Sequence, residues 1–193
     1  MVTSRPYGFG FELMDIRGQR YAAHGGASGV FLLHFLDEPL TIAVLTNLSN
    51  TAGPNSVLIA REIAGFLRPS YLQPHHLAPR TDPASAVTDS LRALLVTLAA
   101  GEASPLMTAA HRRWFDATPR NFRTTWFRRL GSIGALAFLT CDDVRGRGVR
   151  MVDPVDRICH YRTSSGAETL FVTAWFAADG KVSFVRFGRS DEL

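Results

Sequence analysis

The residues of this sequence that are best suited to chemistry lie in the stretch 21–29, where His24 is followed by Gly25 and Gly26. An imidazole can accept or donate a proton near neutral pH. Glycine has no Cβ, so two glycines on a strand allow another group to approach the backbone closely. Ser28 offers a hydroxyl that a histidine base could activate for nucleophilic attack. Because no acidic residue that would orient His24 lies nearby in the sequence, we rank this serine–histidine hypothesis below the two that follow.

The segments around this triplet follow an order that is typical of one hydrolase family. The order is an aromatic–glycine strand (7–11), the triplet, two apolar strands (30–36 and 40–45), the phrase Leu45-Thr46-Asn47, and a helix (56–67). In this order the first third of the chain resembles the C-terminal part of the serine β-lactamase and penicillin-recognising hydrolases, in their class C and esterase-like branch. The alternative for the triplet taken alone is a glycine-rich bend without a catalytic role.

The resemblance implies roles for four residues. His24 would take the place of the cation in the family's third active-site motif and would orient a substrate carboxylate or the catalytic base. Gly25 and Gly26 would keep the strand open to the substrate, and the backbone N–H of Ala27 would donate one hydrogen bond to the oxyanion. Loss of one such donor typically slows acyl transfer by about a hundredfold or more. The resemblance implies neither a metal nor a cofactor.

The first two active-site motifs of that family are absent from the sequence. A Ser-x-x-Lys motif places the lysine one helical turn after the nucleophile, but Ala178 stands three residues before Lys181, the only lysine. No tyrosine or serine is followed two positions later by asparagine. We therefore expect a C-terminal fragment of a hydrolase that has no activity as an isolated chain. The alternative is a non-catalytic accessory protein whose residues 83–193 bind a partner or a small apolar ligand.

Other histidines and the tryptophans give weaker signals. His75 and His76 are adjacent on a segment that we expect to be extended, so their side chains should point in opposite directions and not share a metal ion. His111 lies on an apolar helical stripe and is expected to be a hydrogen-bonded core histidine. The tryptophans are interpreted as core residues rather than a ligand cage; they are Trp114, Trp126 and Trp175.

The two cysteines, Cys141 and Cys159, do not form a Cys-x-x-Cys pair. They could pair if their strands are neighbours, but two buried free thiols are the preferred interpretation. Together with Asp142, Asp143 and His160 they show no recognised metal-site spacing, so no metal site is predicted.

Composition and charge narrow the class of protein. The chain has 193 residues, of which 46% are hydrophobic and 20% charged, which fits a globular protein of one large or two small domains. No apolar run is long enough to span a bilayer, and no apolar signal core follows Met1. The compartment is therefore left open, although the resembled family is often exported. The net charge is +4 and the arginines of 112–129 alternate with apolar residues, so nucleic-acid binding is not expected.

The apolar patterns predict an α+β protein in two parts. Residues 1–68 should form an antiparallel sheet with a C-terminal covering helix, as a partial β-lactamase-like domain. A strand at 7–15 should pair with 20–23 through a hairpin, and the helix 56–67 should bury its apolar stripe, formed by Ile59, Ile63, Phe66 and Leu67. The other sheet face would then need cover, from the missing N-terminal part of the hydrolase or from another protein. The proline-rich stretch 69–82 is interpreted as a linker.

Residues 83–193 are predicted to form a three-helix plus antiparallel-sheet domain, which resembles the NTF2/SnoaL-like cone in architecture. An N-cap residue followed by proline marks three expected helix starts: Asp82-Pro83, Ser104-Pro105 and Thr118-Pro119. The first helix should bury Val87, Leu91, Leu94, Leu95 and Leu98. The expected strands are 133–140, 148–152, 157–162, 169–177 and 182–187, with hairpin turns at 164–166 and 179–180.

Overall fold

The computed structural model describes residues 7–16, 19–47, 55–146 and 153–190, and it divides the chain into two compact units with a boundary between His76 and Leu77. Each unit combines helices with an antiparallel sheet, so the α+β class is confirmed. The boundary falls within the stretch 69–82, which contains two short 3-10 helices, η1 (Pro69–Tyr71) and η2 (Pro74–His76). The predicted strand 148–152 lies outside the described residues.

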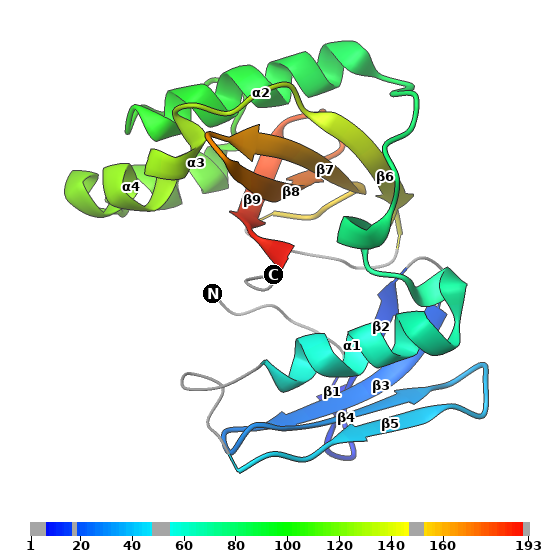
Figure 1. The fold of residues 1–193 in the computed structure, drawn as a ribbon. Helices are drawn as coiled ribbons and strands as arrows, with labels where there is room; N and C mark the ends of the chain where they lie inside the picture. Colours follow the sequence, from blue (N-terminus) through cyan, green and yellow to red (C-terminus); the bar gives the residue numbers. More distant parts are fainter. Residues whose placement is uncertain (1–6, 17–18, 48–54, 147–152, 191–193) are drawn as a thin grey trace. The chain divides into compact units, whose positions relative to one another are not determined.

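The first unit is a five-stranded antiparallel sheet with one helix on one face (Figure 1). Its strands follow one another in sequence order: β1 (Tyr7–Gly8), β2 (Phe11–Ile16), β3 (Gln19–Gly26), β4 (Val30–Phe35) and β5 (Thr41–Val44). Helix α1 (Ser56–Leu67) has the predicted bounds, and its N-cap Asn55 accepts hydrogen bonds from Val57 and Leu58 N–H. Alternate residues of β3, β4 and β5 form the core with α1.

The prediction of one strand over 7–15 is wrong, because the chain turns back on itself at Phe9 and Gly10. Both residues have positive φ, +53° and +85°, which is the geometry of a tight two-residue hairpin turn. Tyr7 therefore pairs with Glu12 as an edge strand. The aromatic side chain of Phe9 is fully exposed at the turn, a conformation that bulky residues seldom adopt.

The prediction of the buried stripe on α1 is right for Ile59, which packs against the core, and wrong for the other three residues. Ala60 and Ala64 face the sheet and are buried, whereas Phe66 is 89% exposed and Ile63 and Leu67 are also exposed. Val57 and Ile59 of α1 are partly buried and pack against the same core. The exposed residues Ile63, Phe66 and Leu67 lie on the outer surface of the unit.

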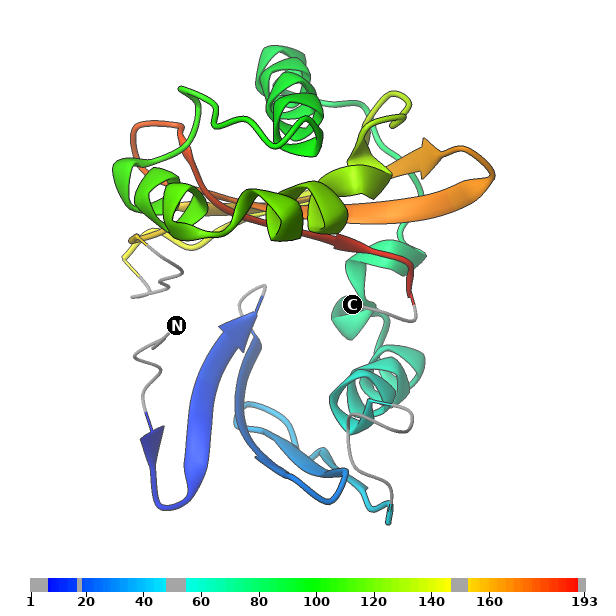
Figure 2. The same cartoon turned by 90° about the vertical axis from the view of Figure 1, so that its left-hand side faces the viewer.

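The second unit places its helices on one face of a four-stranded antiparallel meander (Figure 2). The helices are α2 (Ser85–Ala99), α3 (Ala109–Ala117), α4 (Arg120–Phe127) and the 3-10 helix η3 (Arg128–Leu130). The strands are β6 (Ala137–Asp143), β7 (Arg157–Ser165), β8 (Glu168–Phe176) and β9 (Val182–Gly188). Four leucines of α2 form the centre of the core, as predicted: Leu91, Leu94, Leu95 and Leu98.

The helix starts in this unit differ from the predicted ones. Helix α3 begins after Thr108, whose hydroxyl accepts the His111 N–H, while the Ser104 hydroxyl accepts the Leu106 N–H in a turn before the helix. The Thr118 hydroxyl donates to Trp114 O at the end of α3 and does not cap α4. A hydroxyl before proline can therefore accept a hydrogen bond from a following backbone N–H or donate one to a preceding carbonyl. The sequence alone does not show which of these bonds forms.

The preferred interpretation of the cysteines is wrong, because Cys141 and Cys159 form a disulfide. The two residues are directly opposite each other on β6 and β7. Their antiparallel pairing across 18 residues of sequence brings the sulfur atoms together. Neither thiolate is then available to a metal ion.

Candidate functional site

A cavity of about 330 Å³ lies in the second unit, between α3, α4 and β9. This volume is near the lower end of the range, roughly 300–1,000 Å³, that is typical of small-molecule sites. Much of its wall is aromatic, and it also contains three basic side chains, His111, Arg123 and Arg186. The cavity therefore offers an apolar body with a few polar groups, which is the usual composition of a ligand site.

His111 is the most buried polar residue of this wall, with none of its surface exposed. Its Nδ1 lies 3.1 Å from the Val182 backbone oxygen, and the prediction of a hydrogen-bonded core histidine is confirmed. A carbonyl oxygen only accepts hydrogen bonds, so Nδ1 carries the hydrogen. Burial lowers the pKa of His111, and the Val182 carbonyl and Asp153 partly oppose this shift. The ring is thus neutral at pH 7, and Nε2 presents a lone pair.

Nε2 of His111 has no hydrogen-bond partner within the part of the chain that the structure describes. The same is true of Nε of Arg123, whose guanidinium lies 4.4 Å from the centre of the Phe115 ring. Buried polar atoms are nearly always paired, so two unpaired ones on one cavity wall call for an explanation. One atom is a hydrogen-bond acceptor and the other a donor, so a molecule that paired with both would need a donor hydrogen and an acceptor oxygen.

The prediction that all tryptophans are core residues is wrong for two of them. Trp114 is 36% exposed and Trp126 is 58% exposed, and both line the cavity. Trp126 stacks on Phe122, and Trp114 contacts Phe184 edge to face. Trp175 contacts Phe184 from β8 and is not part of the wall. In a sequence, aromatic residues at helical spacing predict a buried helix face. Only the packing in the folded chain shows which of these residues remain exposed.

The triplet singled out in the sequence lies at the end of β3. His24 and Gly25 are exposed, and Gly26 packs so closely on β4 that a Cβ would lie 2.7 Å from Val30 Cγ2. Ala27 and Ser28 form the turn into β4, which the Gly29 N–H closes on the Gly26 oxygen.

Two contacts connect this triplet to the rest of the first unit. The Thr46 hydroxyl donates to Gly29 O at 2.8 Å and so ties the Leu-Thr-Asn phrase to the turn. Tyr7 Oη lies 3.4 Å from His24 Nδ1. Among the described residues no hydrogen bond joins Ser28 to His24, so the geometry gives no support to a serine–histidine nucleophile.

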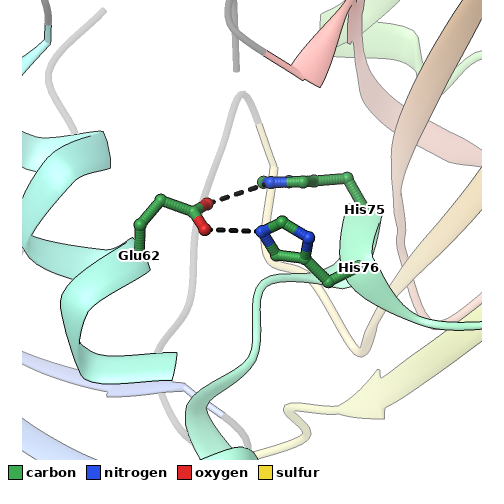
Figure 3. Close-up of side chains that lie close together, drawn as sticks. All are labelled: Glu62, His75 and His76. Carbon is green, nitrogen blue, oxygen red and sulfur yellow. Dashed lines mark hydrogen bonds and ion pairs between the residues drawn. The ribbon is translucent and has the colours of Figure 1, made fainter. Parts of the chain in front are cut away.

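A third group of chemically active side chains joins α1 to η2. His75 and His76 are not extended as predicted: they form a 3-10 turn after Pro74, and both rings reach Glu62 (Figure 3). Nε2 of His75 lies 3.0 Å from Glu62 Oε1, and Nε2 of His76 lies 2.5 Å from Oε2. Burial lowers the pKa of His75, and the Glu62 carboxylate opposes that shift. The sequence reasoning missed this group because Glu62 is thirteen positions away from His75.

Comparison with models of protein families, with curated proteins and with solved structures gave no match to this chain. Among the described residues, no helix combines the length and the apolar character that a bilayer crossing requires.

Proposed function

We propose that the second unit, residues 77–193, binds a small aromatic or apolar molecule that carries an acidic oxygen and a hydroxyl or amine hydrogen. The observation that carries this proposal is the pair of unpaired, buried nitrogen atoms, His111 Nε2 and Arg123 Nε, on one aromatic cavity wall. An unmet buried polar atom is costly, about 1–3 kcal/mol, so a ligand that pairs both atoms binds with a matching advantage.

The charges of the wall favour an anionic end. Arg123 and Arg186 line the cavity, and no carboxylate does among the residues that form the wall. The aromatic residues Trp114, Phe122 and Trp126 supply flat faces on which an aromatic ring stacks. The ligand class is thus a small aromatic acid with a donor at its other end.

Tryptophan fluorescence tests this proposal directly, because two of the three tryptophans line the cavity. We expect 4-hydroxybenzoate to quench the emission saturably and to bind more tightly than benzoate, which lacks the hydroxyl donor. In His111→Phe the preference for the hydroxylated probe should disappear. Absence of saturable quenching by both probes would refute the proposal.

A matched pair of arginines on α4 supplies the control. Arg123→Met should weaken 4-hydroxybenzoate binding by roughly tenfold to a hundredfold, since a charge-assisted hydrogen bond is lost. Arg120→Met should leave binding unchanged, because Arg120 does not line the cavity and pairs with Glu102. Equal effects of the two substitutions would show that binding depends on net charge and not on this wall.

A second candidate function concerns the first unit: we propose that residues 1–68 correspond to the C-terminal part of a serine β-lactamase-like domain, with His24, Gly25, Gly26 and Ala27 on its substrate wall. The support is the antiparallel sheet with α1 on one face, the exposed triplet at the end of β3, and the Thr46 hydrogen bond to the following turn. The nucleophile and base are not in this sequence, so the isolated chain would bind substrate weakly and not turn it over.

This candidate is tested by nuclear magnetic resonance with benzylpenicillin at millimolar concentration. We expect the amide signals of residues 24–27 to shift, and the shifts to disappear in His24→Ala. His34→Ala serves as the control, because His34 is also exposed on the same sheet and hydrogen-bonds Thr41. Unchanged amide signals, or hydrolysis of a chromogenic β-lactam by the isolated chain, would contradict it.

A further inference from the structure

The cluster formed by Glu62, His75 and His76 brings three metal-binding side chains to one point of the first unit. One ligand atom from each residue lies within 4.8 Å of the other two. Two neutral imidazoles and one carboxylate form a common ligand set for a divalent transition metal. We infer that this cluster is a zinc-type site, formed when a metal ion takes the place of the contacts between Glu62 and the two histidines.

The backbone around η2 explains why neighbouring histidines converge. Pro74 opens the 3-10 turn, and the His76 N–H closes it on the Gln73 oxygen. The two imidazole rings lie with their centres 4.3 Å apart and are tilted by 49°. Adjacent side chains of an extended segment would diverge, so the turn is what directs both Nε2 atoms towards α1.

The helix side of the cluster is held by the core of the same unit. The Tyr71 ring, just before η2, is buried and stacks on Phe35 with 4.2 Å between ring centres. Tyr71 therefore anchors the returning segment beside α1, where Glu62 lies. All three ligand residues belong to one compact unit, so the site is positioned by packing that the structure defines.

Both imidazoles contact the Glu62 carboxylate, and one carboxylate oxygen lacks a well-aligned hydrogen bond. Oε1 of Glu62 is buried and accepts no hydrogen bond within the described residues, although His75 Nε2 lies 3.0 Å away. A carboxylate oxygen in that position has the charge and lone pair to bind a metal ion directly. The His75 side chain is 7% exposed and the His76 side chain 45%, so one side of the cluster is closed and the other admits an ion.

The three ligand atoms would have to move only a little to bind one zinc ion. Zinc bonds of about 2.0–2.1 Å place the atoms of a tetrahedral ligand set about 3.3 Å apart. From the observed separations, each pair of ligand atoms has to change by roughly 1.5 Å or less. Three protein ligands leave one position of a tetrahedral zinc ion for water, as in sites with open coordination.

The inference is tested on the full chain after removal of any histidine tag and treatment with a chelator. We expect equilibrium dialysis against Zn²⁺ to give one ion per chain and a rise in melting temperature with zinc concentration. Co²⁺ in its place should give the visible absorption bands of a four-coordinate site with nitrogen and oxygen ligands. Binding of no zinc would overturn the inference and leave the cluster as an ion pair between α1 and η2.

Substitutions distinguish this cluster from adventitious binding elsewhere. Glu62→Gln and His75→Gln retain hydrogen-bonding groups, and each should weaken zinc binding by about tenfold or more because a ligand is lost. The controls are His24→Gln and His34→Gln, which alter exposed histidines of the same unit and should not change the affinity. If zinc binds equally well to Glu62→Gln and His75→Gln, the ion occupies another position and the inference is wrong. The Co²⁺ spectrum of the unmodified chain tests it independently of how the variants fold.

Discussion

The two units expose their large apolar side chains in different ways. In the second unit, three of the exposed large apolar residues, Trp114, Phe122 and Trp126, line one cavity. In the first unit, such residues are spread over β1, β2, a hairpin turn, the segments that follow β4 and β5, and the helix, for example Phe9, Leu45 and Phe66. The aromatic residues around one cavity fit the small-ligand proposal, whereas single apolar residues dispersed over a surface are ordinary and point to no particular partner.

The hydrophobic cores of the two units also differ, in size and in the residues that their helices contribute. The second unit buries four leucines of α2, and Phe115, Phe127 and Phe176 pack in the same core. The first unit has a smaller core in which α1 contributes mainly Ala60 and Ala64. All three tryptophans lie in the second unit, so tryptophan fluorescence reports on that unit alone. The following experiments use this difference.

The largest effect is expected from breaking the disulfide. Cys141→Ser should destabilise the second unit by about 2–4 kcal/mol, because the bridge restricts the unfolded chain over 18 residues. Urea unfolding followed by tryptophan fluorescence measures this. Far-ultraviolet circular dichroism should show that the first unit keeps its own transition, and loss of both transitions together would show that the two units unfold as one.

The next effect comes from the helix face of the first unit. Ala60→Leu inserts a large side chain where the exposed fraction is zero and should destabilise the unit by about 1–3 kcal/mol. Phe66→Ala should change the stability by less than about 0.5 kcal/mol, since its side chain is exposed. Thermal unfolding followed by circular dichroism compares the two variants. The reverse order would mean that the apolar stripe of α1 is the packed face after all.

The stability of the second unit should fall in mild acid through His111. Burial lowers the pKa of His111 in the folded state, so the unfolded chain takes up the proton first as the pH falls. The neutral ring makes its full contribution to the free energy of unfolding above pH ~6.5. Below that pH the contribution is lost, by at most about 1.4 kcal/mol per pH unit. Urea unfolding by tryptophan fluorescence at several pH values measures the slope. His111→Asn should flatten it, and an unchanged slope would assign the titration to another group.

The smallest effect is expected from the helix caps, one in each unit. Asn55→Ala removes the side chain that accepts two N–H groups of α1, and Thr108→Ala removes the cap of α3. Each should destabilise its own unit by about 1 kcal/mol. Only Thr108→Ala should shift the transition seen by tryptophan fluorescence. A shift in Asn55→Ala of the same size would indicate that the two units are coupled.

Local patterns were sufficient to predict much of the backbone. The bounds of α1, the approximate bounds of β7, β8 and β9, and the hairpin turns at Gly166 and Gly180 follow from period, capping and turn residues. The strand predicted at 133–140 lies further along the chain, at Ala137–Asp143. These signals act over a few residues, so a sequence contains them in full. Local signals predicted a strand at 20–23, but β3 continues to Gly26, so His24, Gly25 and Gly26 lie within the strand and only Ala27 lies in the turn.

Tertiary structure alone determined which chemically active side chains come together. The Cys141–Cys159 bridge depends on strand register, the convergence of Glu62 with His75 and His76 depends on a turn beside α1, and the open side of the aromatic stripe depends on how α3 and α4 pack on β9. Each of these joins residues that are distant in sequence, and packing chooses among several compatible partners. Periodicity shows that a residue has an apolar neighbourhood, but only the folded chain determines which atoms are left without a partner.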